Sequence, residues 1–378
     1  MEQDQASQFI NDLLKLLLAR KGSDLFITVD FPPALKVDGK TVKVSSTALN
    51  AAHTVALVRS VMNDKQAAEF ERTKECNFAI APAGIGRFRC NAFMQQGNVG
   101  MVLRTIPQHI PTIDELGLPP ILKEIAMTKR GLAIAVGGTG TGKSTSLAAM
   151  IDWRNTYSHG HIISVENPIE FVHAHKNCII TQREIGIDTD SWEAALTNTL
   201  RQAPDVIVMG EIRDRETMEH AIAFSETGHL CMATLHANNA NQALDRILNF
   251  FPDERRAQVL MDLSMNLRGF VSQRLLPKQG ARGRVAAVEI MLNSPLISDH
   301  IFKGEIGQIR DVMKRSTELG MQTFDQHLFT LFEEGLIGYE DALRNADSAN
   351  GLRLDIKLNS KRARQPDLAK GTEHLQIV

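Results

Sequence analysis

The spacing of hydrophobic residues near the N-terminus predicts a helix followed by short strands. Apolar residues recur there every three or four positions, which is the period of one face of an amphipathic helix. The pattern stops near Lys21–Gly22, where we expect the helix to end. Short apolar segments separated by Pro and Gly residues follow it, as is typical of strands. The apolar positions of the helix are Phe9, Ile10, Leu13, Leu14, Leu17 and Leu18.

Residues 1–105 are predicted to form a small α+β domain. A helical pattern covers residues 48–71, between two groups of expected strands. The next segment, residues 106–120, contains four prolines, and proline at this density makes a semi-rigid connector. We therefore place the domain boundary there. The expected strands of the first domain are residues 25–29, 34–37, 77–80, 87–93 and 99–105.

The hydrophobic pattern of residues 121–345 is different, because several short runs in it are apolar at every position. Strands of this kind are buried on both faces, so their alternation with helical segments predicts a parallel sheet covered by helices. Residues 240–345 are mostly helical in pattern, and residues 346–378 are polar, so we expect a mobile tail there. The expected strands of this second domain are residues 132–136, 162–165, 206–209, 230–235 and 285–290.

The composition argues against several classes of protein. Hydrophobic residues make up 43% of the 378 residues and charged residues 23%, which is typical of a globular chain long enough for two domains. The net charge of −2 does not indicate a surface built for nucleic acid. The four cysteines form no C-x-x-C pair, so we expect no zinc site and a reducing, cytoplasmic setting. No apolar run approaches the roughly 20 residues of a membrane span, so any membrane association is expected through a partner.

The segment Gly137–Ser144 matches the phosphate-binding pattern G-x-x-x-x-G-K-S/T. It lies between the expected strand 132–136 and a helical pattern from Thr145 to Trp153, the strand–loop–helix order that the motif needs. Glycines let backbone N–H groups point inward at phosphate oxygens, and the helix N-terminus adds partial positive charge. We therefore predict that the chain binds and hydrolyses ATP. The predicted nucleotide-binding residues are Gly137, Gly138, Thr139, Gly140, Thr141, Gly142, Lys143, Ser144 and Thr145.

Two side chains of this loop have predicted roles toward the phosphates and their cation. Lys143 is expected to place its charge against the β- and γ-phosphates of ATP. The hydroxyl of Ser144 is expected to be a ligand of Mg²⁺. ATP and Mg²⁺ are therefore the predicted cofactors.

Two glutamates follow expected strands and are candidates for the hydrolysis chemistry. Glu166 follows strand 162–165, and Glu211 follows strand 206–209 after Gly210, at the sheet edge where ligands of parallel sheets bind. Hydrolysis needs one carboxylate to orient or activate water and an acidic contact to the Mg²⁺ shell. We assign Glu166 to the water and Glu211 to the Mg²⁺ shell, and the reverse assignment stays open. Gly210 stands where a commoner Walker B strand has Asp, so we expect no direct Asp–Mg²⁺ bond.

Two histidines flank the expected strand 230–235. His236 lies at its carboxyl end, near the expected γ-phosphate, and is predicted to sense that phosphate by a hydrogen bond. His229 lies seven residues earlier, which is about 23 Å along an extended strand. From the residues alone, a structural role is the better interpretation for His229.

Three arginines of the first domain are candidates for a role at a subunit boundary. Arg87 and Arg89 alternate on one expected strand and so project from the same face, and Arg104 precedes the proline-rich connector. One interpretation is an arginine finger that supplies positive charge to a neighbouring subunit's nucleotide. The alternative is a solvated strand face.

Several segments resemble the motifs of the PilT/PilU branch of secretion-type ATPases, the cytoplasmic motors of type IV pili. Residues 163–171, ISVENPIEF, are similar to the Asp box of this family, and residues 208–214 to its Walker B motif, Gly included. Residues 226–236 resemble its His box. Residues 86–89 and 103–107 resemble its N-terminal arginine segments.

The resemblance covers nearly the whole chain, from about residue 5 to residue 345. It implies an α/β protein with a PAS-like first domain and a RecA-like ATPase domain that ends in a helical part. It also implies a homo-hexamer with ATP at the subunit interfaces, in which both His229 and His236 contribute. The implied partners are a PilT-type retraction ATPase and the inner-membrane platform protein of the pilus, which would hold the chain at the cytoplasmic side of the membrane.

Departures from the family pattern refine this interpretation. Asn167 replaces the usual Asp of the Asp box. PilT members carry Ala-Ile-Arg-Asn-Leu-Ile-Arg-Glu where this chain has Leu296–Lys303, without either arginine. That stretch and the longer tail resemble the PilU side of the family. The four-cysteine zinc site of the extension motors is absent from the sequence.

The sequence therefore favours an accessory retraction motor that hydrolyses ATP. The alternative is an ATP-binding coupling module that stacks on the main motor with little turnover of its own. A nucleic-acid motor is disfavoured by the near-neutral charge and the lack of aromatic stacking positions. Lys361–Arg364 suggest a docking segment for an acidic partner surface, and a solvated tail is the alternative interpretation.

Overall fold

The computed structural model describes residues 3–37, 39–107 and 109–362. These residues divide into two compact units. The first runs to residue 109 and includes the short segments 168–172 and 186–188, and the second contains the rest. Among the described helices, none combines the length and the apolar character of a membrane-crossing segment.

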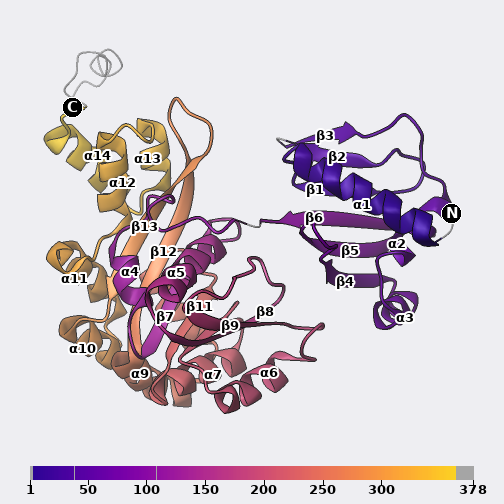
Figure 1. The fold of residues 1–378 in the computed structure, drawn as a ribbon. Helices are drawn as coiled ribbons and strands as arrows, with labels where there is room; N and C mark the ends of the chain where they lie inside the picture. Colours follow the sequence, from indigo (N-terminus) through magenta and orange to yellow (C-terminus); the bar gives the residue numbers. More distant parts are fainter. Residues whose placement is uncertain (1–2, 38, 108, 363–378) are drawn as a thin grey trace. The chain divides into compact units, whose positions relative to one another are not determined.

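The first unit consists of an antiparallel sheet and three helices (Figure 1). Its strands follow the order β3-β2-β1-β6-β5-β4. The first and last strands of this unit, β1 and β6, are therefore paired side by side. One core joins the first helix to the sheet, and Ile10, Leu14 and Phe88 are fully buried in it. The elements are α1 (Gln3–Ala19), β1 (Asp24–Ile27), β2 (Ala34–Val37), β3 (Lys40–Lys43), α2 (Ala51–Arg59), α3 (Asp64–Thr73), β4 (Glu75–Ile80), β5 (Arg87–Gln95) and β6 (Asn98–Ile106).

Two asparagines divide the helical pattern of residues 48–71 into the separate helices α2 and α3. The side chain of Asn50 accepts a hydrogen bond from the backbone N–H of His53 at 2.8 Å, and that of Asn63 from Gln66 at 2.9 Å. Both sites are capping boxes, which favour a helix start at these positions. Strand β3 was not predicted, because all four of its residues are exposed and it carries no apolar run.

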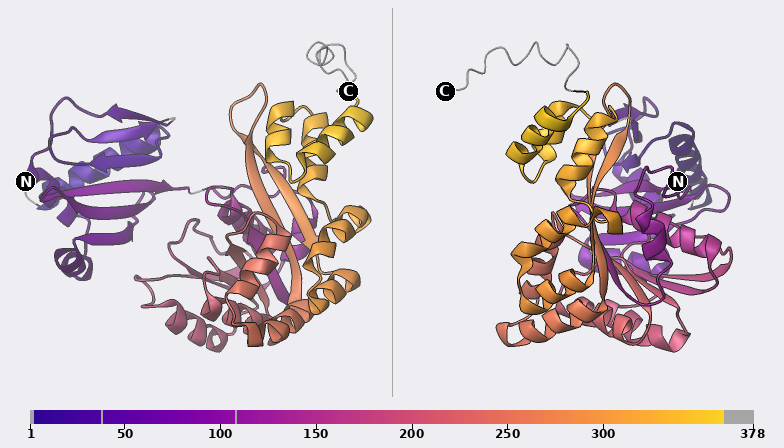
Figure 2. Two further views of the ribbon diagram at one scale, coloured as in Figure 1. Left: turned by 180° about the vertical axis from the view of Figure 1, so that it is seen from behind. Right: turned by 90° about the vertical axis from the view of Figure 1, so that its left-hand side faces the viewer.

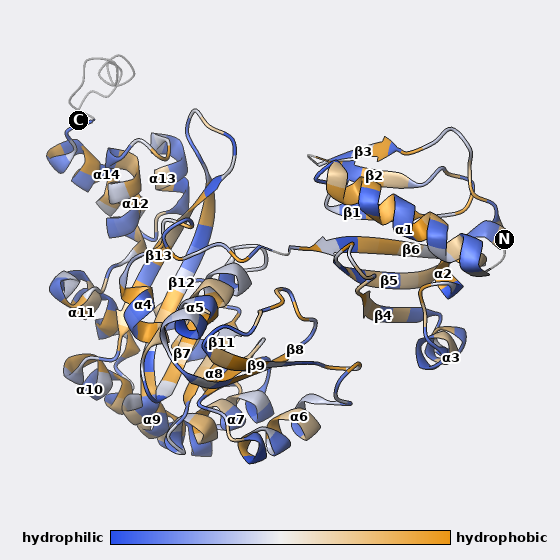
Figure 3. Cartoon of the chain, in the orientation of Figure 1, coloured by the Kyte–Doolittle hydropathy of each residue, from blue (hydrophilic) through white to orange (hydrophobic). Residues whose placement is uncertain are grey.

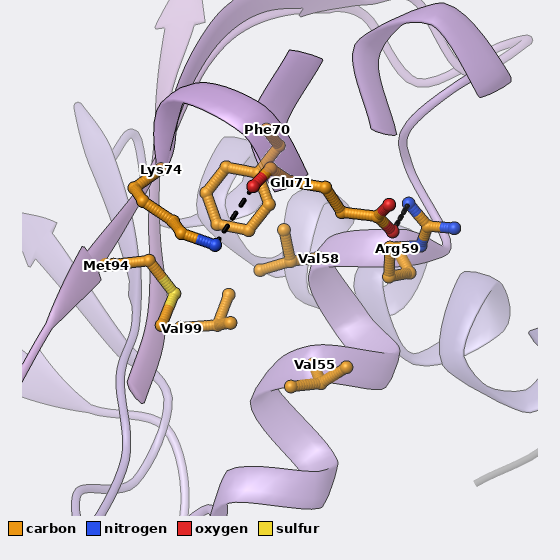
Figure 4. A pocket seen from close by; sticks show the side chains of 8 residues that line it. All are labelled: Val55, Val58, Arg59, Phe70, Glu71, Lys74, Met94 and Val99. Carbon is orange, nitrogen blue, oxygen red and sulfur yellow. Dashed lines mark hydrogen bonds and ion pairs between the residues drawn. The ribbon is translucent and has the colours of Figure 1, made fainter. Parts of the chain in front are cut away.

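A hollow of about 250 Å³ lies between α2, α3 and the two strands β5 and β6 (Figure 4). An ion pair between Arg59 and Glu71 at 3.2 Å closes one side, and Lys74 donates to the carbonyl of Glu71 at 2.9 Å. None of the predicted nucleotide-binding or catalytic residues lines this hollow. The lining residues are Val55, Val58, Arg59, Phe70, Glu71, Lys74, Met94 and Val99.

The second unit is built on a seven-stranded sheet of order β13-β12-β7-β11-β10-β8-β9. All neighbouring strands in it are parallel except β12 and β13, which form an antiparallel hairpin. The strands are β7 (Gly131–Val136), β8 (Gly160–Glu166), β9 (Cys178–Glu184), β10 (Val206–Met209), β11 (Leu230–Leu235), β12 (Leu267–Pro277) and β13 (Arg284–Leu292).

Helices cover both faces of this sheet, as the apolar runs predicted. Every residue of β7, β10 and β11 is buried, and two separate apolar cores lie on the two faces. In Figure 3 the helices show hydrophilic and hydrophobic colours side by side, as expected when one face packs on the sheet. The helices are α4 (Ile121–Ala126), α5 (Lys143–Tyr157), α6 (Trp192–Thr199), α7 (Arg215–Glu226), α8 (Ala240–Asn249), α9 (Asp253–Asn266), α10 (Pro295–Lys303), α11 (Ile309–Arg315), α12 (Phe324–Glu333), α13 (Tyr339–Asn345) and α14 (Ala349–Asn359).

Two strands of the sheet were not predicted. Residues 240–345 are mostly helical, as expected, but the expectation of a single strand there is wrong, because β12 pairs with both β7 and β13. Polar residues such as Ser272 and Gln273 interrupt its apolar pattern, although both are buried. Strand β9 lies at the sheet edge and has only two of its seven residues apolar and buried.

The expected connector and the expected tail both differ from the prediction. Ile113 and Leu118 of the proline-rich segment are buried in a core of the second unit, so this part of the segment belongs to that unit. The tail was expected to be mobile, but α14 forms within it and buries Leu352 and Ile356. Both views in Figure 2 place α12 to α14 beside the β12–β13 hairpin.

The proposed docking segment Lys361–Arg364 is described only for its first two residues. The guanidinium of Arg362 donates to the carbonyls of Phe332 at 2.6 Å and Ile337 at 3.1 Å. It also lies over the ring of Phe332, 4.6 Å from the ring centroid. Arg362 is therefore engaged within its own unit rather than projecting toward a partner.

Candidate nucleotide-binding and catalytic site

The phosphate-binding loop joins the carboxyl end of β7 to the first residue of α5, Lys143. Gly140 and Gly142 have φ angles of +77° and +91°, a conformation that favours glycine. A Cβ atom on Gly137 would lie 2.4 Å from Oγ1 of Thr141 and 2.8 Å from the carbonyl oxygen of Gln273. Glycine is therefore required at Gly140 and Gly142 for a left-handed backbone, and at Gly137 for close packing against Thr141 and β12.

Lys143 lies inside this loop and is almost fully buried. Its Nζ atom donates hydrogen bonds of 2.8 Å to the carbonyls of both Gly137 and Gly138. The same atom lies 3.5 Å from Nδ1 of His236. The ammonium group is thus held at the mouth of the loop, where the motif places phosphate oxygens.

His236 links the phosphate loop to the acidic end of the neighbouring strand. It follows the last residue of β11, and its Nε2 atom lies 3.4 Å from Oε1 of Glu211, which follows β10. The two ring nitrogens therefore face Lys143 on one side and Glu211 on the other. The predicted residues Lys143, His236 and Glu211 come together at the carboxyl ends of three adjacent strands, β7, β11 and β10.

Glu166 is the last residue of β8, on the other side of β10. Its Oε1 atom accepts hydrogen bonds from Oγ of Ser164 at 2.6 Å and from Nε2 of Gln182 at 3.1 Å. These two hydrogen bonds orient the carboxylate at the end of β8. Gln182 lies on β9, a strand that was not predicted.

Gly210 separates β10 from Glu211 at the place where commoner Walker B strands have Asp. A Cβ atom there would lie 3.2 Å from Cα of Glu166 and 3.4 Å from the carbonyl oxygen of Val165. The carbonyl of Gly210 also accepts a hydrogen bond from Oγ1 of Thr234 at 2.6 Å. The close approach of β8 to β10 accounts for a residue without a side chain at this position.

Gln273 on β12 contacts the phosphate loop and the first turn of α5, and the sequence did not predict this role. Its Oε1 atom accepts a buried hydrogen bond of 2.6 Å from Oγ of Ser146 in the first turn of α5. A Cβ atom on Gly142 would lie only 2.6 Å from the Nε2 atom of Gln273, so Gln273 packs closely against this glycine. No local pattern indicates this contact, because the two bonded residues are 127 positions apart in the chain.

His229 lies at the opposite end of β11 from His236. Its carbonyl accepts a hydrogen bond from the N–H of Gly131 at the start of β7, at 2.9 Å. Its Nδ1 atom lies 3.1 Å from Oγ1 of Thr227. Within one chain, the structure does not bring His229 to the phosphate loop.

The three candidate arginines lie on two paired strands of the first unit. Arg89 on β5 is directly opposite Arg104 on β6. Nε of Arg104 donates to Oδ1 of Asp24 at 2.8 Å. Burial alone would raise the pKa of Asp24, but hydrogen bonds from Ser23 and Arg104 outweigh it and hold that pKa below its usual value.

An open hollow of about 620 Å³ adjoins the phosphate loop at Gly138 and His236. The rest of its wall is the loop after β11 and one side of α8. The other residues that line it are Ala237, Asn238, Gln242, Asp245, Arg246, Asn249 and Phe250. Gly138 and His236 therefore lie beside a space that is open to solvent.

Comparison with known proteins identifies the family. A family model described as type II/IV secretion system protein matches residues 2–323 of the chain. The chain belongs to this family. It is 60% identical to the type IV pilus ATPase PilU of Pseudomonas aeruginosa, over 92% of this chain and 91% of that protein. It is 41% identical to the pilus retraction ATPase PilT of the same species, over 89% of this chain and 98% of that protein.

A solved structure of the pilus retraction motor PilT with bound ADP shares the fold of this secretion-family chain. Its TM-score is 0.86 at 40% identity, and the match covers 91% of this chain and 99% of the other. The relatives confirm the expected α/β fold and the expected place in the PilT/PilU branch. The chain is therefore a P-loop ATPase of the secretion type.

Proposed function

We propose that the chain is a homo-hexameric, Mg²⁺-dependent ATPase that powers retraction of type IV pili, as an accessory motor beside a PilT-type ATPase. It would act in the cytoplasm, held at the inner membrane by the platform protein of the pilus. The observation that carries the proposal is the contact series Lys143–His236–Glu211 across three strand ends. It places a cation, a titratable ring and a carboxylate at one phosphate loop, in a chain 60% identical to a PilU.

Nucleotide binding would exchange one set of contacts of Lys143 for another. The ammonium group now satisfies the carbonyls of Gly137 and Gly138 at 2.8 Å. The β- and γ-phosphate oxygens of ATP are stronger acceptors, because they carry charge. The remaining residues of the loop, Gly137 to Thr145, would present backbone N–H groups to the phosphates.

The donor set suits a hard divalent cation that is bound mainly through phosphate and water. Among the described residues, no group of three or more His, Cys, Asp or Glu side chains is arranged to hold a metal ion alone. The hydroxyl of Ser144 and the carboxylate of Glu211 would supply the protein's share, the latter through a coordinated water. Mg²⁺ would neutralise charge on the β- and γ-phosphates.

Glu166 would orient or activate the attacking water. The hydrogen bonds from Ser164 and Gln182 would hold the carboxylate in position for this role. His236 would report the presence of the γ-phosphate to Glu211, because one of its ring nitrogens faces Lys143 and the other faces Glu211. The reverse assignment of Glu166 and Glu211 remains the alternative, and it predicts that Glu211→Gln rather than Glu166→Gln blocks hydrolysis after binding.

Arg87, Arg89 and Arg104 would complete the site of a neighbouring subunit, and His229 would act at the same boundary. A ring with sites at its interfaces needs positive charge from the adjoining subunit. Arg104 is available for such a contact because its side chain is 66% exposed even though it is paired with Asp24.

The competing proposal is an ATP-binding coupling module with little turnover. The stretch that departs from the PilT pattern lies on α10. This departure favours a chain whose activity depends on a partner. Two polar side chains of α10 are paired locally, Lys303 with Asp299 at 2.6 Å and His300 with Glu305 at 2.9 Å.

Pilus retraction in cells that retain a working PilT-type ATPase separates the two proposals. The variant Lys143→Ala should lose the contribution of this chain to retraction force, and Lys129→Ala, an exposed lysine outside the site, should not. If Glu166→Gln, which should bind ATP without hydrolysing it, supports retraction as well as the unaltered chain does, hydrolysis here is not used and the coupling module is the correct account.

A further inference from the structure

We infer that Arg274 and Asp347 are positioning residues that tie the C-terminal helices to the loop carrying His236. The inference rests on the proposed role of His236 in the site. It gives a function in catalysis to a region that the sequence presents as a polar tail.

Arg274 on β12 is the centre of the link. Its Nη2 atom donates to Oδ1 of Asp347 at 2.6 Å and to the carbonyl of Asn238 at 3.3 Å. Its Nη1 atom donates to the carbonyl of Asn345 at the end of α13. The Cζ atom of Arg274 lies over the ring of Phe324, the first residue of α12, 3.9 Å from the ring centroid. One side chain therefore touches the loop after β11 and the starts or ends of two C-terminal helices.

Asp347 is fixed from the other side by a second ion pair. Its backbone N–H donates to Oδ1 of Asp325 at 2.8 Å, and Asp325 accepts a hydrogen bond of 2.7 Å from Arg310. Arg310 also lies 3.8 Å from Asp347. The side chains of Asp347 and Arg274 are only 10% and 21% exposed, so solvent screens their interaction weakly.

The loop from His236 to Ala240 is thereby held at three points. His236 meets Lys143 and Glu211. The carbonyl of Asn238 accepts from Arg274. The N–H of Ala240 donates to the buried carboxylate of Glu289 at 2.7 Å, and Ser272 donates to the same oxygen at 3.0 Å.

Removing the carboxylate of Asp347 would change one of these points without touching the phosphate loop. Arg274 would lose its charged partner and would no longer be held against the carbonyl of Asn238. His236, two residues before Asn238, would then be less well placed for the γ-phosphate. We expect slower hydrolysis with little change in ATP binding, because Lys143 and the loop glycines keep their contacts.

The test compares Asp347→Asn with Asp311→Asn, an exposed carboxylate on α11, in the full chain. We expect Asp347→Asn to lower kcat about three- to thirty-fold, the range of couplings carried by packed and hydrogen-bonded networks. The affinity for a fluorescent ATP analogue should stay within about two-fold, since the phosphate loop is intact. Hydrogen exchange of a peptide covering residues 236–240 should accelerate in Asp347→Asn and stay unchanged in Asp311→Asn.

A purely structural role predicts a different pattern. The melting temperature of Asp347→Asn would fall while kcat and exchange at residues 236–240 stay at their unaltered values, and the inference would be wrong. If Asp347→Asn does not fold, Arg274→Lys serves in its place, because it keeps the charge but cannot make the forked contacts. Unchanged kcat and exchange in that variant would likewise overturn the inference.

His236→Ala, assayed in parallel, separates this inference from the proposed function. If His236→Ala hydrolyses ATP normally, the proposed role of His236 fails and the link has nothing to position. If His236→Ala is slow and Asp347→Asn is normal, only the inference fails. If both are slow, the double variant should be no slower than His236→Ala alone, because both changes act through one residue.

Discussion

Close backbone approach decides which residues of the phosphate loop tolerate a side chain. Gly137 and Gly138 are adjacent glycines of the same motif, but a Cβ atom added to each would have very different neighbours. At Gly137 it would overlap Thr141 and the backbone of Gln273, whereas at Gly138 its nearest neighbour is Cγ2 of Thr141 at 3.8 Å. The motif alone does not distinguish the two positions.

We expect Gly137→Ala to weaken ATP binding by roughly ten-fold or more, because the backbone of β12 cannot yield and the loop must shift. Gly307→Ala is the control and should bind ATP as well as the unaltered chain does, because Gly307 lies outside the site and a Cβ atom there has no neighbour within 4 Å. Titration with a fluorescent ATP analogue measures both. Equal affinities would mean that the loop adapts freely and that its fit against β12 is unimportant.

Glu289 makes the stability of the second unit depend on pH in a defined direction. Burial raises its pKa from 4.5 to about 7, although hydrogen bonds from Ala240 and Ser272 oppose the shift. Between these two values the folded chain holds a proton that the unfolded chain does not. This contribution is therefore complete below the unfolded pKa and is lost as the pH rises through about 7.

The variant Glu289→Gln keeps the neutral form at every pH. The melting temperature of this variant, relative to that of the unaltered chain, should increase as the pH rises from about 5 to about 8. Only the unaltered chain must ionise a buried carboxyl over this range. Melting curves at both pH values test this. A difference between the two proteins that does not change with pH would show that Glu289 does not titrate in this range.

Some residues of the site could be predicted from the sequence and others could not. Lys143, Glu211 and His236 each follow a fully apolar strand or lie in a motif, so their position at one sheet edge follows from topology. Gln273, Arg274 and Glu289 reach the same region from β12 and β13, more than 100 residues further along the chain than the phosphate loop. Nothing local marks them, because their partners become neighbours only when the sheet forms.

The same distinction holds at the scale of helices and strands. Central strands such as β7 and β11 were predicted because both of their faces are apolar. Strand β12 was missed because it carries the polar residues that serve the site, and β9 was missed because it is a half-exposed edge. The two strands that the hydrophobic pattern does not reveal are thus β12, which carries side chains that contact the site, and β9, which forms an edge of the sheet.

Helix α14 should contribute measurably to stability, although its segment looks like a tail. Leu352 is 1% exposed in a core shared with α12 and α13, so Leu352→Ala should cost about 2–4 kcal/mol. Leu354 on the same helix is 55% exposed, and Leu354→Ala should change stability by no more than about 0.5 kcal/mol. Urea unfolding of the two variants measures the difference. Similar small effects for both would mean that α14 is not docked in solution.

At the scale of the whole molecule, the phosphate loop belongs to one unit and the candidate arginines belong to the other. In the proposed function, the second unit would supply the nucleotide contacts, a water-orienting carboxylate and a sensing histidine. Arg87, Arg89 and Arg104 belong to the first unit, and their proposed use at a neighbouring subunit depends on assembly into a ring. Turnover is therefore expected to depend on protein concentration or on a PilT-type partner.

Mg²⁺-dependent phosphate release by the purified chain, with and without a PilT-type ATPase, tests the central claim most directly. We predict release that Lys143→Ala and Glu166→Gln both abolish, either in the chain alone or above the partner's own rate in the mixture. Glu166→Gln should still bind ATP, whereas Lys143→Ala should not. Release that persists in both variants, or none above the partner's rate under any condition, would contradict hydrolysis at this site.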